Sequence, residues 1–252
     1  MNKEPLVSII MPLFETEEYL QETIDSVLDQ VYKNWELIII DDCSSDNSFK
    51  IALDNSKKDE RVKVCRQKNN SGAAEARNKG VKIAQGSYLA FLDSDDIWEK
   101  DKLNRQIHFM MENNVYFTCS YYGKIDENSQ NLGIIKKTPS EMDYNQLLID
   151  CPGNSTVVYN VAKLGKTYIP NIKKRNDYLM WLKVIKKAEL IYTLPDVLAY
   201  HRVRSGSISR NKLSLIKYHW YIYTKLEKIG YTKSFWVLSI LILRGVKFKL
   251  IK

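Results

Sequence analysis

The sequence of 252 residues has no hydrophobic run long enough to cross a lipid bilayer. Its longest apolar stretch covers residues 235–243 and is interrupted by Ser239, whereas a membrane-spanning helix needs about 20 apolar residues. The first residues, Met-Asn-Lys-Glu-Pro, lead directly into another apolar run and lack the features of a signal peptide. We therefore expect a cytoplasmic protein without a transmembrane helix.

Cysteine is scarce, and the four that are present form no CxxC pair and show no metal-ligand spacing. They are typical of reduced thiols rather than of a disulfide framework. Internal repeats are absent, and no linker rich in proline, glycine or serine divides the first 210 residues. We expect one domain over residues 1–210 and a separate tail over residues 211–252.

Glycine is absent from residues 12–18, the loop that follows the first apolar run. Backbone N–H groups that cradle a phosphate need glycine for close approach. Its absence weighs against Rossmann dehydrogenases and sugar nucleotidyltransferases. A diphosphate bound near this loop would have to be held by a metal ion and by side chains.

Acidic residues are almost absent from the tail. Between Lys212 and Lys252, nine basic residues accompany a single acid, Glu227, so the tail carries the whole formal net charge of +8. The nearly neutral remainder weighs against nucleic-acid binding. Aromatic and basic residues alternating in one segment are typical of a helix that lies on anionic lipid. A packed helix pair with a solvated basic face would give the same composition.

Short apolar runs alternate with helical patterns up to residue 112. We expect strands at residues 7–11, 35–40, 61–66 and 87–92, and helices at residues 17–30, 47–55, 72–84 and 100–112. Further strands are expected at 115–122, 133–136, 156–159, 189–193 and 197–202, and helices at 144–149 and 174–188. The pattern predicts an α/β fold: a mostly parallel mixed sheet flanked by helices, followed by a C-terminal helical tail.

Two groups of aspartates follow expected strands: Asp41 and Asp42 after one, and Asp93, Asp95 and Asp96 after another. Ligands of open α/β sheets bind beyond the carboxyl ends of the strands. Neighbouring carboxylates repel one another unless a cation neutralises them, and Mg²⁺-like ions are held by one or two carboxylates plus substrate phosphates. The pattern favours a Mn²⁺ or Mg²⁺ site, and a solvated acidic turn that caps the next helix is the alternative.

A series of motifs runs in order along residues 6–210: VSIIMP from Val7, WELIIIDD from Trp35, ARNKG from Ala76, FLDSDDIW from Phe91 and DYLMWL from Asp177. In order and spacing the series resembles the family-2 inverting glycosyltransferases of the GT-A fold. The stretch RVRSGSIS from Arg202 is similar to bacterial enzymes that make surface polysaccharides, including the teichuronic acid biosynthesis group. The resemblance implies metal-dependent transfer of a sugar from a nucleotide diphosphate to an acceptor hydroxyl.

The resemblance also implies a donor site. Asp41 or Asp42 would hydrogen-bond the uracil or the ribose, and Arg77 would face the nucleotide unless it only pairs with a helix face. Asp93 and Asp95 would form the DxD motif that contacts ribose and metal. The full donor-binding set is Pro12, Phe14, Glu15, Asp41, Asp42, Arg77, Asp93, Ser94, Arg202 and Arg204, with Asp95 and Asp96 as metal ligands. The metal would act as a Lewis acid on the departing diphosphate.

Asp177 matches the family's general base. Inversion requires the acceptor hydroxyl to lose its proton as it attacks, and a carboxylate is the natural acceptor of that proton. By its position alone, Asp177 is better explained as a first-turn aspartate favoured by the helix dipole, and the match at Trp181 and Leu182 reverses that preference. Trp181 would either line the acceptor pocket or pack in the core, and Asn154 and Ser155 would border the acceptor site or form a plain turn.

Two positions depart from the family pattern. Asn176 replaces the more frequent Glu next to the base, and Arg204 replaces a His that is sometimes a metal ligand. A guanidinium cannot ligate a cation, but it can bind phosphate oxygens in a bidentate manner. We expect Arg204, with Arg202, to hold the diphosphate. His201 is expected to pack within its strand rather than to bind a ligand.

These features predict an enzyme that moves a sugar, from a UDP-sugar, to a lipid-linked saccharide or oligosaccharide at the inner face of the cytoplasmic membrane. Bacterial surface polysaccharide synthesis is the expected setting. A sugar nucleotidyltransferase is one alternative, which the loop without glycine disfavours. The other is an inactive membrane-associated scaffold, with Asn176 and Arg204 as signs of decay. The retention of Asp93, Asp95 and Asp177 together disfavours this second alternative.

Overall fold

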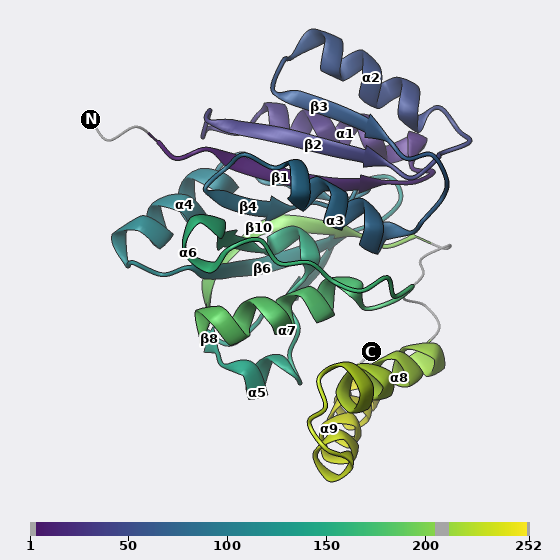
Figure 1. Cartoon of the computed structure of the whole chain (residues 1–252), viewed down its shortest axis with the longest axis vertical. Coiled ribbons are helices and arrows are strands. Elements are labelled where there is room, and N and C mark those ends of the chain that lie inside the picture. The colour runs from purple at the N-terminus through teal and green to yellow at the C-terminus, as the bar shows by residue number, and fades with distance from the viewer. Residues whose placement is uncertain (1–3, 205–211, 251–252) are drawn as a thin grey trace.

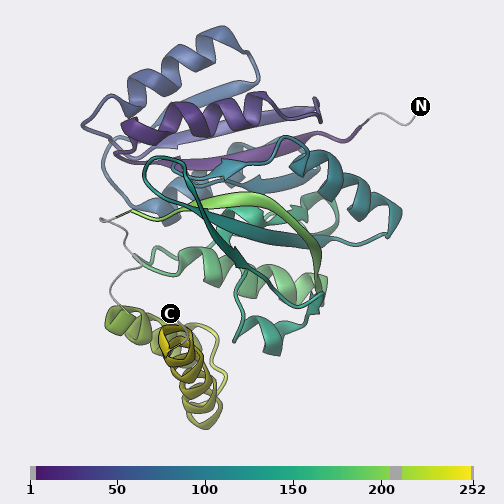
Figure 2. The same ribbon diagram turned by 180° about the vertical axis from the view of Figure 1, so that it is seen from behind.

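The computed structural model describes residues 4–204 and 212–250. Four strands open the chain: β1 (Val7–Leu13), β2 (Trp35–Asp41), β3 (Val62–Arg66) and β4 (Tyr88–Phe91). They pair in parallel in the order β3–β2–β1–β4. The helices that connect them are α1 (Glu17–Leu28), α2 (Ser48–Lys58) and α3 (Ala73–Ile83). Figure 1 shows α3 in front of this sheet, and Figure 2 shows α1 on the opposite face.

The second half of the chain extends the sheet in mixed directions. Its strands are β5 (Ile97–Trp98), β6 (Phe117–Ile125), β7 (Asn131–Lys136), β8 (Glu141–Met142), β9 (Val158–Asn160) and β10 (Ile191–Arg202). β9 runs antiparallel between β4 and β6, and β6 pairs in parallel with β10. The helices are α4 (Lys102–Glu112), α5 (Tyr144–Leu147), α6 (Val161–Leu164) and α7 (Asn176–Ala188), with a 3₁₀ turn, η1 (Asn154–Thr156). The expected α/β fold with a mostly parallel mixed sheet is confirmed.

Two hydrophobic clusters cover the two faces of the sheet. Along β1, Val7 and Ile9 belong to the cluster beneath α1, α2 and α4, whereas Ile10 belongs to the cluster beneath α3 and α7. This alternation follows from the two-residue period of a strand. Because both faces of β1, β2 and β4 are buried, these strands are nearly continuous apolar runs.

Trp181 is a core residue. Its side chain is fully buried in the α7 cluster and meets Phe91 edge to face, with ring centroids 4.9 Å apart. Of the two roles considered for it, the structure therefore favours packing, and the expected place in the acceptor pocket is corrected.

The strand β10 is continuous where the sequence suggested two strands. The strands expected at 189–193 and 197–202 left a gap at residues 194–196, which contains Pro195 and Asp196. In the structure the strand passes through this point with shifts of register relative to β6, at Leu194/Val197 and at Val197/Ala199. A bulge accommodates the proline, which has no N–H to give to the neighbouring strand.

The tail is helical, as expected. It consists of α8 (Lys212–Tyr221), a π-helical segment, η3 (Ile222–Leu226), and α9 (Tyr231–Leu250), which Figures 1 and 2 show together below α7. The expected boundary at residues 210 and 211 lies outside the described residues. Within residues 4–204 and 212–250, no helix combines the length and the apolar character that crossing a bilayer requires.

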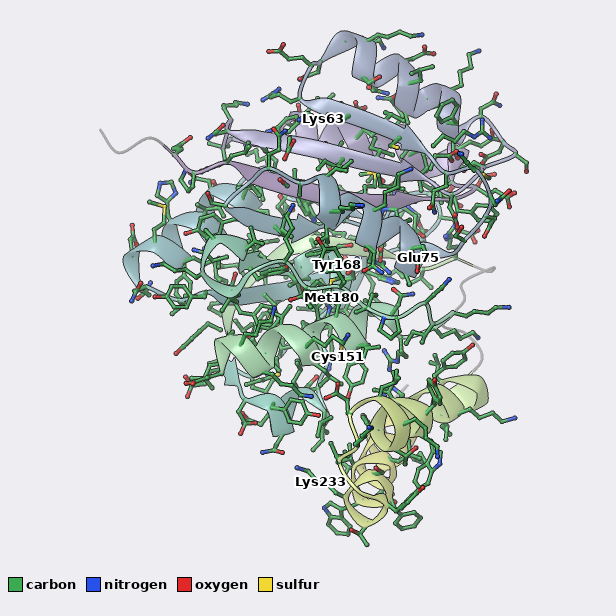
Figure 3. All side chains as sticks on the ribbon, viewed as in Figure 1. Lys63, Glu75, Cys151, Tyr168, Met180 and Lys233 are labelled. Atoms are coloured by element: carbon green, nitrogen blue, oxygen red, sulfur yellow. The ribbon has the colours of Figure 1, made fainter. Side chains whose placement is uncertain are left out.

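The tail helices are attached to the body of the protein. Ile222, Tyr223 and Val237 belong to the same buried cluster as α7. Lys233 of α9, labelled in Figure 3, donates a 2.7 Å hydrogen bond to Asn145 of α5. The helices therefore share the hydrophobic core on the α7 side of the sheet.

Candidate active site

A cavity of about 330 Å³ lies where β1 and β4 end. Its walls come from the loop after β1, the start of α3, the aspartates after β4, the end of β10, residues 173–177 and one residue of α8. Ten residues predicted for the site line it: Pro12, Phe14, Asp42, Arg77, Asp93, Ser94, Asp95, Asp177, Arg202 and Arg204. The structure thus brings together side chains from both halves of the sequence, as expected for the edge where ligands of α/β sheets bind.

Arg77 connects the two halves of the cavity. Its side chain projects from α3 and is 7% exposed. One terminal nitrogen forms an ion pair with Asp93 at 2.7 Å, and the other donates to the side-chain oxygen of Asn176. The guanidinium therefore links the aspartates after β4 to the start of α7. Asn176, which departs from the family pattern, has a defined partner here.

Asn154 and Ser155 lie behind the aspartates rather than on the cavity wall. Asn154 donates to the carboxylate of Asp93 at 2.8 Å. Ser155 accepts from the backbone N–H of Asp93 at 3.1 Å and donates to Asp96 at 2.5 Å. Both residues are nearly buried. The expected contact with the acceptor is corrected to a structural role, because η1 holds the aspartate turn in place.

Asp96 is buried and has its carboxylate oxygens occupied. One accepts from Ser155 and the other from the backbone N–H of Arg202 at 3.1 Å. Burial, with the charges of Asp93 and Asp95 adding to it, raises the pKa of Asp96 to about 7. The expectation of a metal ligand at this position is corrected, since the side chain does not line the cavity and bonds to protein atoms instead.

Asp95 does line the cavity. Burial raises the pKa of its carboxyl group, and Arg204, whose Nε lies 2.7 Å from the carboxylate, opposes the shift. His201 opposes the upward shift of the Asp95 pKa as Arg204 does, and its side chain lines the cavity. His201 packs within β10, with its ring centroid 6.2 Å from that of Tyr122, and whether it also binds a ligand stays a prediction. Among the described residues, no group of three or more histidine, cysteine or acidic side chains is arranged to bind a metal.

Arg202 and Arg204 differ sharply in their surroundings. Arg202 is fully buried, pairs with Glu22 at 2.7 Å, and donates from Nε to the backbone oxygen of Asp95. It gives further hydrogen bonds to the loop at residues 126–129. The predicted contact with a diphosphate is therefore corrected for Arg202, because its donors are occupied. Arg204 is 32% exposed and pairs only with Asp95 among the described residues.

The two aspartates at the end of β2 also differ in their surroundings. Asp41 is fully buried and pairs with Arg66 at 3.1 Å, outside the cavity. Asp42 lines the cavity and accepts hydrogen bonds from the backbone N–H groups of Ser71 and Gly72, both at 2.7 Å. Asp42 therefore fixes the loop before α3. Glu15 lies in a neighbouring depression.

Asp177 occupies the first turn of α7 and faces the cavity. It has no hydrogen bond or ion pair with any described residue, so its carboxylate is available to a bound molecule. Lys173, Lys174 and Arg175 line the cavity beside it, and we did not predict them. The run of three basic residues before Asp177 was the signal that could have identified them.

Comparisons with known proteins agree with this geometry. A family model described as glycosyl transferase family 2 matches residues 8–163. TuaG of Bacillus subtilis (strain 168), named for teichuronic acid biosynthesis, is 39% identical over 236 residues, which cover 93% of this chain and 94% of TuaG. WfgD of Escherichia coli, a UDP-Glc:α-D-GlcNAc-diphosphoundecaprenol β-1,3-glucosyltransferase, is 38% identical over 244 residues, 93% of this chain and 94% of WfgD.

Solved structures share the fold. The S. aureus protein TarS, residues 1–349 in complex with UDP-GlcNAc, superimposes with a TM-score of 0.74 at 22% identity, over 96% of this chain and 73% of that one. The mannosyltransferase PcManGT of Pyrobaculum calidifontis, in complex with GDP-Man and Mn²⁺, gives a TM-score of 0.67 at 17% identity, over 95% and 69%. With the family model and the curated relatives, the conclusion is plain: this chain is a glycosyltransferase and belongs to glycosyl transferase family 2.

Proposed function

We propose that the protein transfers a sugar, with inversion, from a UDP-sugar to a hydroxyl of a lipid-diphosphate-linked saccharide in bacterial surface polysaccharide synthesis. The observation that carries the proposal is a single cavity lined both by Asp93 and Asp95 and by Asp177. An inverting transfer needs carboxylates that hold the donor and a separate carboxylate that serves the acceptor. The name of WfgD, a UDP-glucose-dependent enzyme with a lipid-diphosphate acceptor, supports the donor and acceptor classes.

In the proposed step, Asp177 accepts the proton of the acceptor hydroxyl while the oxygen attacks the anomeric carbon of the donor. The bond from that carbon to the diphosphate breaks, and UDP leaves with the bonding electrons. The side chain of Phe14, 42% exposed at the cavity, offers a face on which the uracil can stack. Arg204 would bind oxygens of the leaving diphosphate.

A Mn²⁺ or Mg²⁺ ion fits at Asp95, with Asp93 beside it. Burial raises the pKa of the Asp95 carboxyl group, and a cation bound there would stabilise its carboxylate in addition to the ion pair with Arg204. The described residues offer no larger cluster of ligands, so phosphate oxygens of the donor would complete the coordination. A metal bound there supplies Lewis-acid stabilisation of the departing diphosphate.

Calorimetry of UDP binding, with and without Mn²⁺, tests the donor site. We expect binding that depends on Mn²⁺ in the wild type and is lost in Asp95→Ala. Arg105→Ala is a suitable control, since Arg105 pairs with Asp196 on the surface and does not line the cavity. If the folded wild type bound neither UDP nor GDP, CDP or dTDP, the proposal would fail and the inactive scaffold would become the better explanation.

We also propose that the tail holds the enzyme at the inner face of the cytoplasmic membrane. On α9, Tyr231, Phe235 and Trp236 are 65%, 65% and 68% exposed, whereas Ser234 and Val237 are buried against the body. One face of the helix thus packs, and the other offers aromatic side chains to the surroundings. Together with the basic residues of the tail, such side chains bind the interface of anionic membranes.

Sedimentation with vesicles that contain phosphatidylglycerol tests this attachment. The double variant Phe235→Ser, Trp236→Ser should bind the vesicles more weakly than the wild type. Tyr168→Ser is the matched control, because Tyr168 is an aromatic residue of the body, 45% exposed and labelled in Figure 3. Equal binding by the double variant and the wild type would contradict the proposal, as would a loss in the Tyr168 variant of the same size.

A further inference from the structure

Arg175 lies at the entrance to the helix that carries the proposed base. Its backbone adopts the left-handed conformation, with φ 62° and ψ 25°, a region that is costly for a residue with a Cβ atom. The side chain lines the cavity two positions before Asp177. A glycine would meet the backbone requirement at less cost, which indicates that the arginine side chain itself has a role.

The side chain is anchored from the tail. Nε of Arg175 donates a 2.9 Å hydrogen bond to Nε2 of His219 on α8. His219 is 5% exposed, and its Nδ1 lies 3.1 Å from the hydroxyl of Tyr223. That hydroxyl in turn donates to the backbone oxygen of Leu148. Since Nε2 accepts from a guanidinium, the ring is neutral and Nδ1–H donates to Tyr223. Burial and the charge of Arg175 lower the pKa of His219 to about 3, in agreement with this arrangement.

This anchor leaves the two terminal nitrogens of Arg175 available. They form no hydrogen bond or ion pair with a described residue. The other arginines of the cavity differ: Arg77 is paired with Asp93, Arg204 with Asp95, and Arg202 with Glu22. Arg175 is therefore the cavity arginine that lacks an acidic partner within the described part of the chain, and a bidentate anion suits it.

The location favours the acceptor as the source of that anion. The donor diphosphate would lie against Asp95 and Arg204, after β4 and β10, whereas Arg175 adjoins Asp177, which would receive the acceptor hydroxyl. Leu215, one helical turn before His219 on the same face of α8, also lines the cavity. The exposed aromatic helix α9 adjoins α8, since the ring centroids of Trp220 and Tyr231 lie 6.1 Å apart, so a lipid-borne acceptor would reach the cavity past α8.

Resting on the proposed function, we propose that Arg175 binds the diphosphate that joins the acceptor saccharide to its lipid, and that His219 is the positioning residue that holds Arg175 for this contact. The tail thereby contributes to the acceptor site in addition to any contact with the membrane. The ligand class is a diphosphate ester, which the donor also contains, and the experiment separates the two sources.

The experiment compares two acceptors. One is GlcNAc-diphosphate with a short alkyl chain, and the other is the matched alkyl glycoside of GlcNAc without phosphate. Arg175→Ala should raise the KM for the first acceptor about 10- to 100-fold, the range of a charge-assisted contact. The KM for the second acceptor and the affinity for UDP should change less than about twofold, since neither uses Arg175.

The role of His219 is tested through Arg175. His219→Phe should raise the KM for the diphosphate acceptor in the same direction, and His219→Gln, whose amide oxygen can accept from Nε, should restore most of the affinity. His108→Phe is the matched control, because His108 is exposed on α4 and bonds only to the backbone oxygen of Asn104. Thermal unfolding of each variant identifies any that are simply unfolded, and Arg175→Gln, which removes the charge but keeps a polar side chain, then replaces Arg175→Ala.

Two results would overturn the inference. One is an equal change for both acceptors in Arg175→Ala, and the other is a loss of UDP affinity with an unchanged KM, which would assign Arg175 to the donor. Failure of the proposed function would look different, since the wild type itself would transfer no sugar. In that case, calorimetry with decyl diphosphate in the presence of UDP still tests the site: weaker binding by Arg175→Ala supports it, and equal binding overturns it.

Discussion

Arg202 and Arg204 lie two residues apart, and replacing each by methionine should affect different properties. The first replacement should lower stability, and the second should lower the affinity for UDP. Arg202 donates to the partly buried backbone oxygens of Asp95 and Asp126, at 2.9 and 3.1 Å. Methionine cannot donate to these oxygens, and each acceptor left without a hydrogen bond lowers the free energy of unfolding by about 1–3 kcal/mol. The ion pair with Glu22 adds little, because that carboxylate is 44% exposed. We expect Arg202→Met to lower the free energy of unfolding by about 2–6 kcal/mol, and the Tm by about 4–24 °C.

Arg204→Met should leave stability nearly unchanged. Its ion pair with Asp95 is partly exposed, so its loss costs less than about 1 kcal/mol, or less than about 4 °C in Tm. The affinity for UDP in the presence of Mn²⁺ should instead fall about 10- to 100-fold, as expected for a lost guanidinium–phosphate contact. Thermal unfolding and calorimetry below the lower Tm measure both quantities. An unchanged Tm with weaker UDP binding in Arg202→Met would refute the structural role of Arg202 and restore it as a diphosphate ligand.

Three further predictions concern single side chains. Asp177→Asn should bind UDP normally while the rate of transfer falls at least about 100-fold; robust transfer, measured by UDP release, would contradict its role as the base. Ser155→Ala should lower the free energy of unfolding by about 1–2 kcal/mol in thermal unfolding, because Asp96 loses a buried partner; an unchanged Tm would count against the role of η1. Lys102 is fully buried, and burial lowers the pKa of its amine from 10.5 to about 7. The unfolded chain therefore binds more protons between pH 7 and 10.5, so stability rises with pH. Lys102→Met should raise the Tm most at pH 7 or below, with a gain that shrinks toward pH 10; a gain independent of pH would show that folding does not lower the pKa of Lys102.

The layout of the sheet could be predicted because its cause is local. The parallel strands β1, β2 and β4 are buried on both faces, and they are therefore nearly continuous apolar runs such as residues 35–40 or 87–92. The continuity of β10 could not be predicted in this way. A proline in a strand is tolerated at a bulge, and whether a bulge forms depends on the partner strand β6, which lies far away in the sequence.

The members of the site could be predicted better than their roles. Motif matching found ten residues that line the cavity, yet it could not distinguish Arg202 from Arg204. The difference arises because Glu22 and residues 126–129 accept hydrogen bonds from Arg202, whereas Arg204 pairs with Asp95. Arg175 was missed for a similar reason, since its partner His219 lies 44 positions later in the sequence and carries no motif of its own.

The two departures from the family pattern acquire an explanation in the same contacts. Asn176 accepts a hydrogen bond from Arg77, whose other terminal nitrogen pairs with Asp93. A glutamate at this position would compete with Asp93 for the guanidinium of Arg77. The neutral amide of Asn176 leaves the positive charge of Arg77 to pair with Asp93 in the proposed donor site. Arg204 likewise pairs with Asp95. Residues in a site that had lost its function would be free to lose hydrogen-bond and ion-pair partners. The contacts of Asn176 and Arg204 therefore weigh against an inactive scaffold and favour a cavity adjusted for a diphosphate.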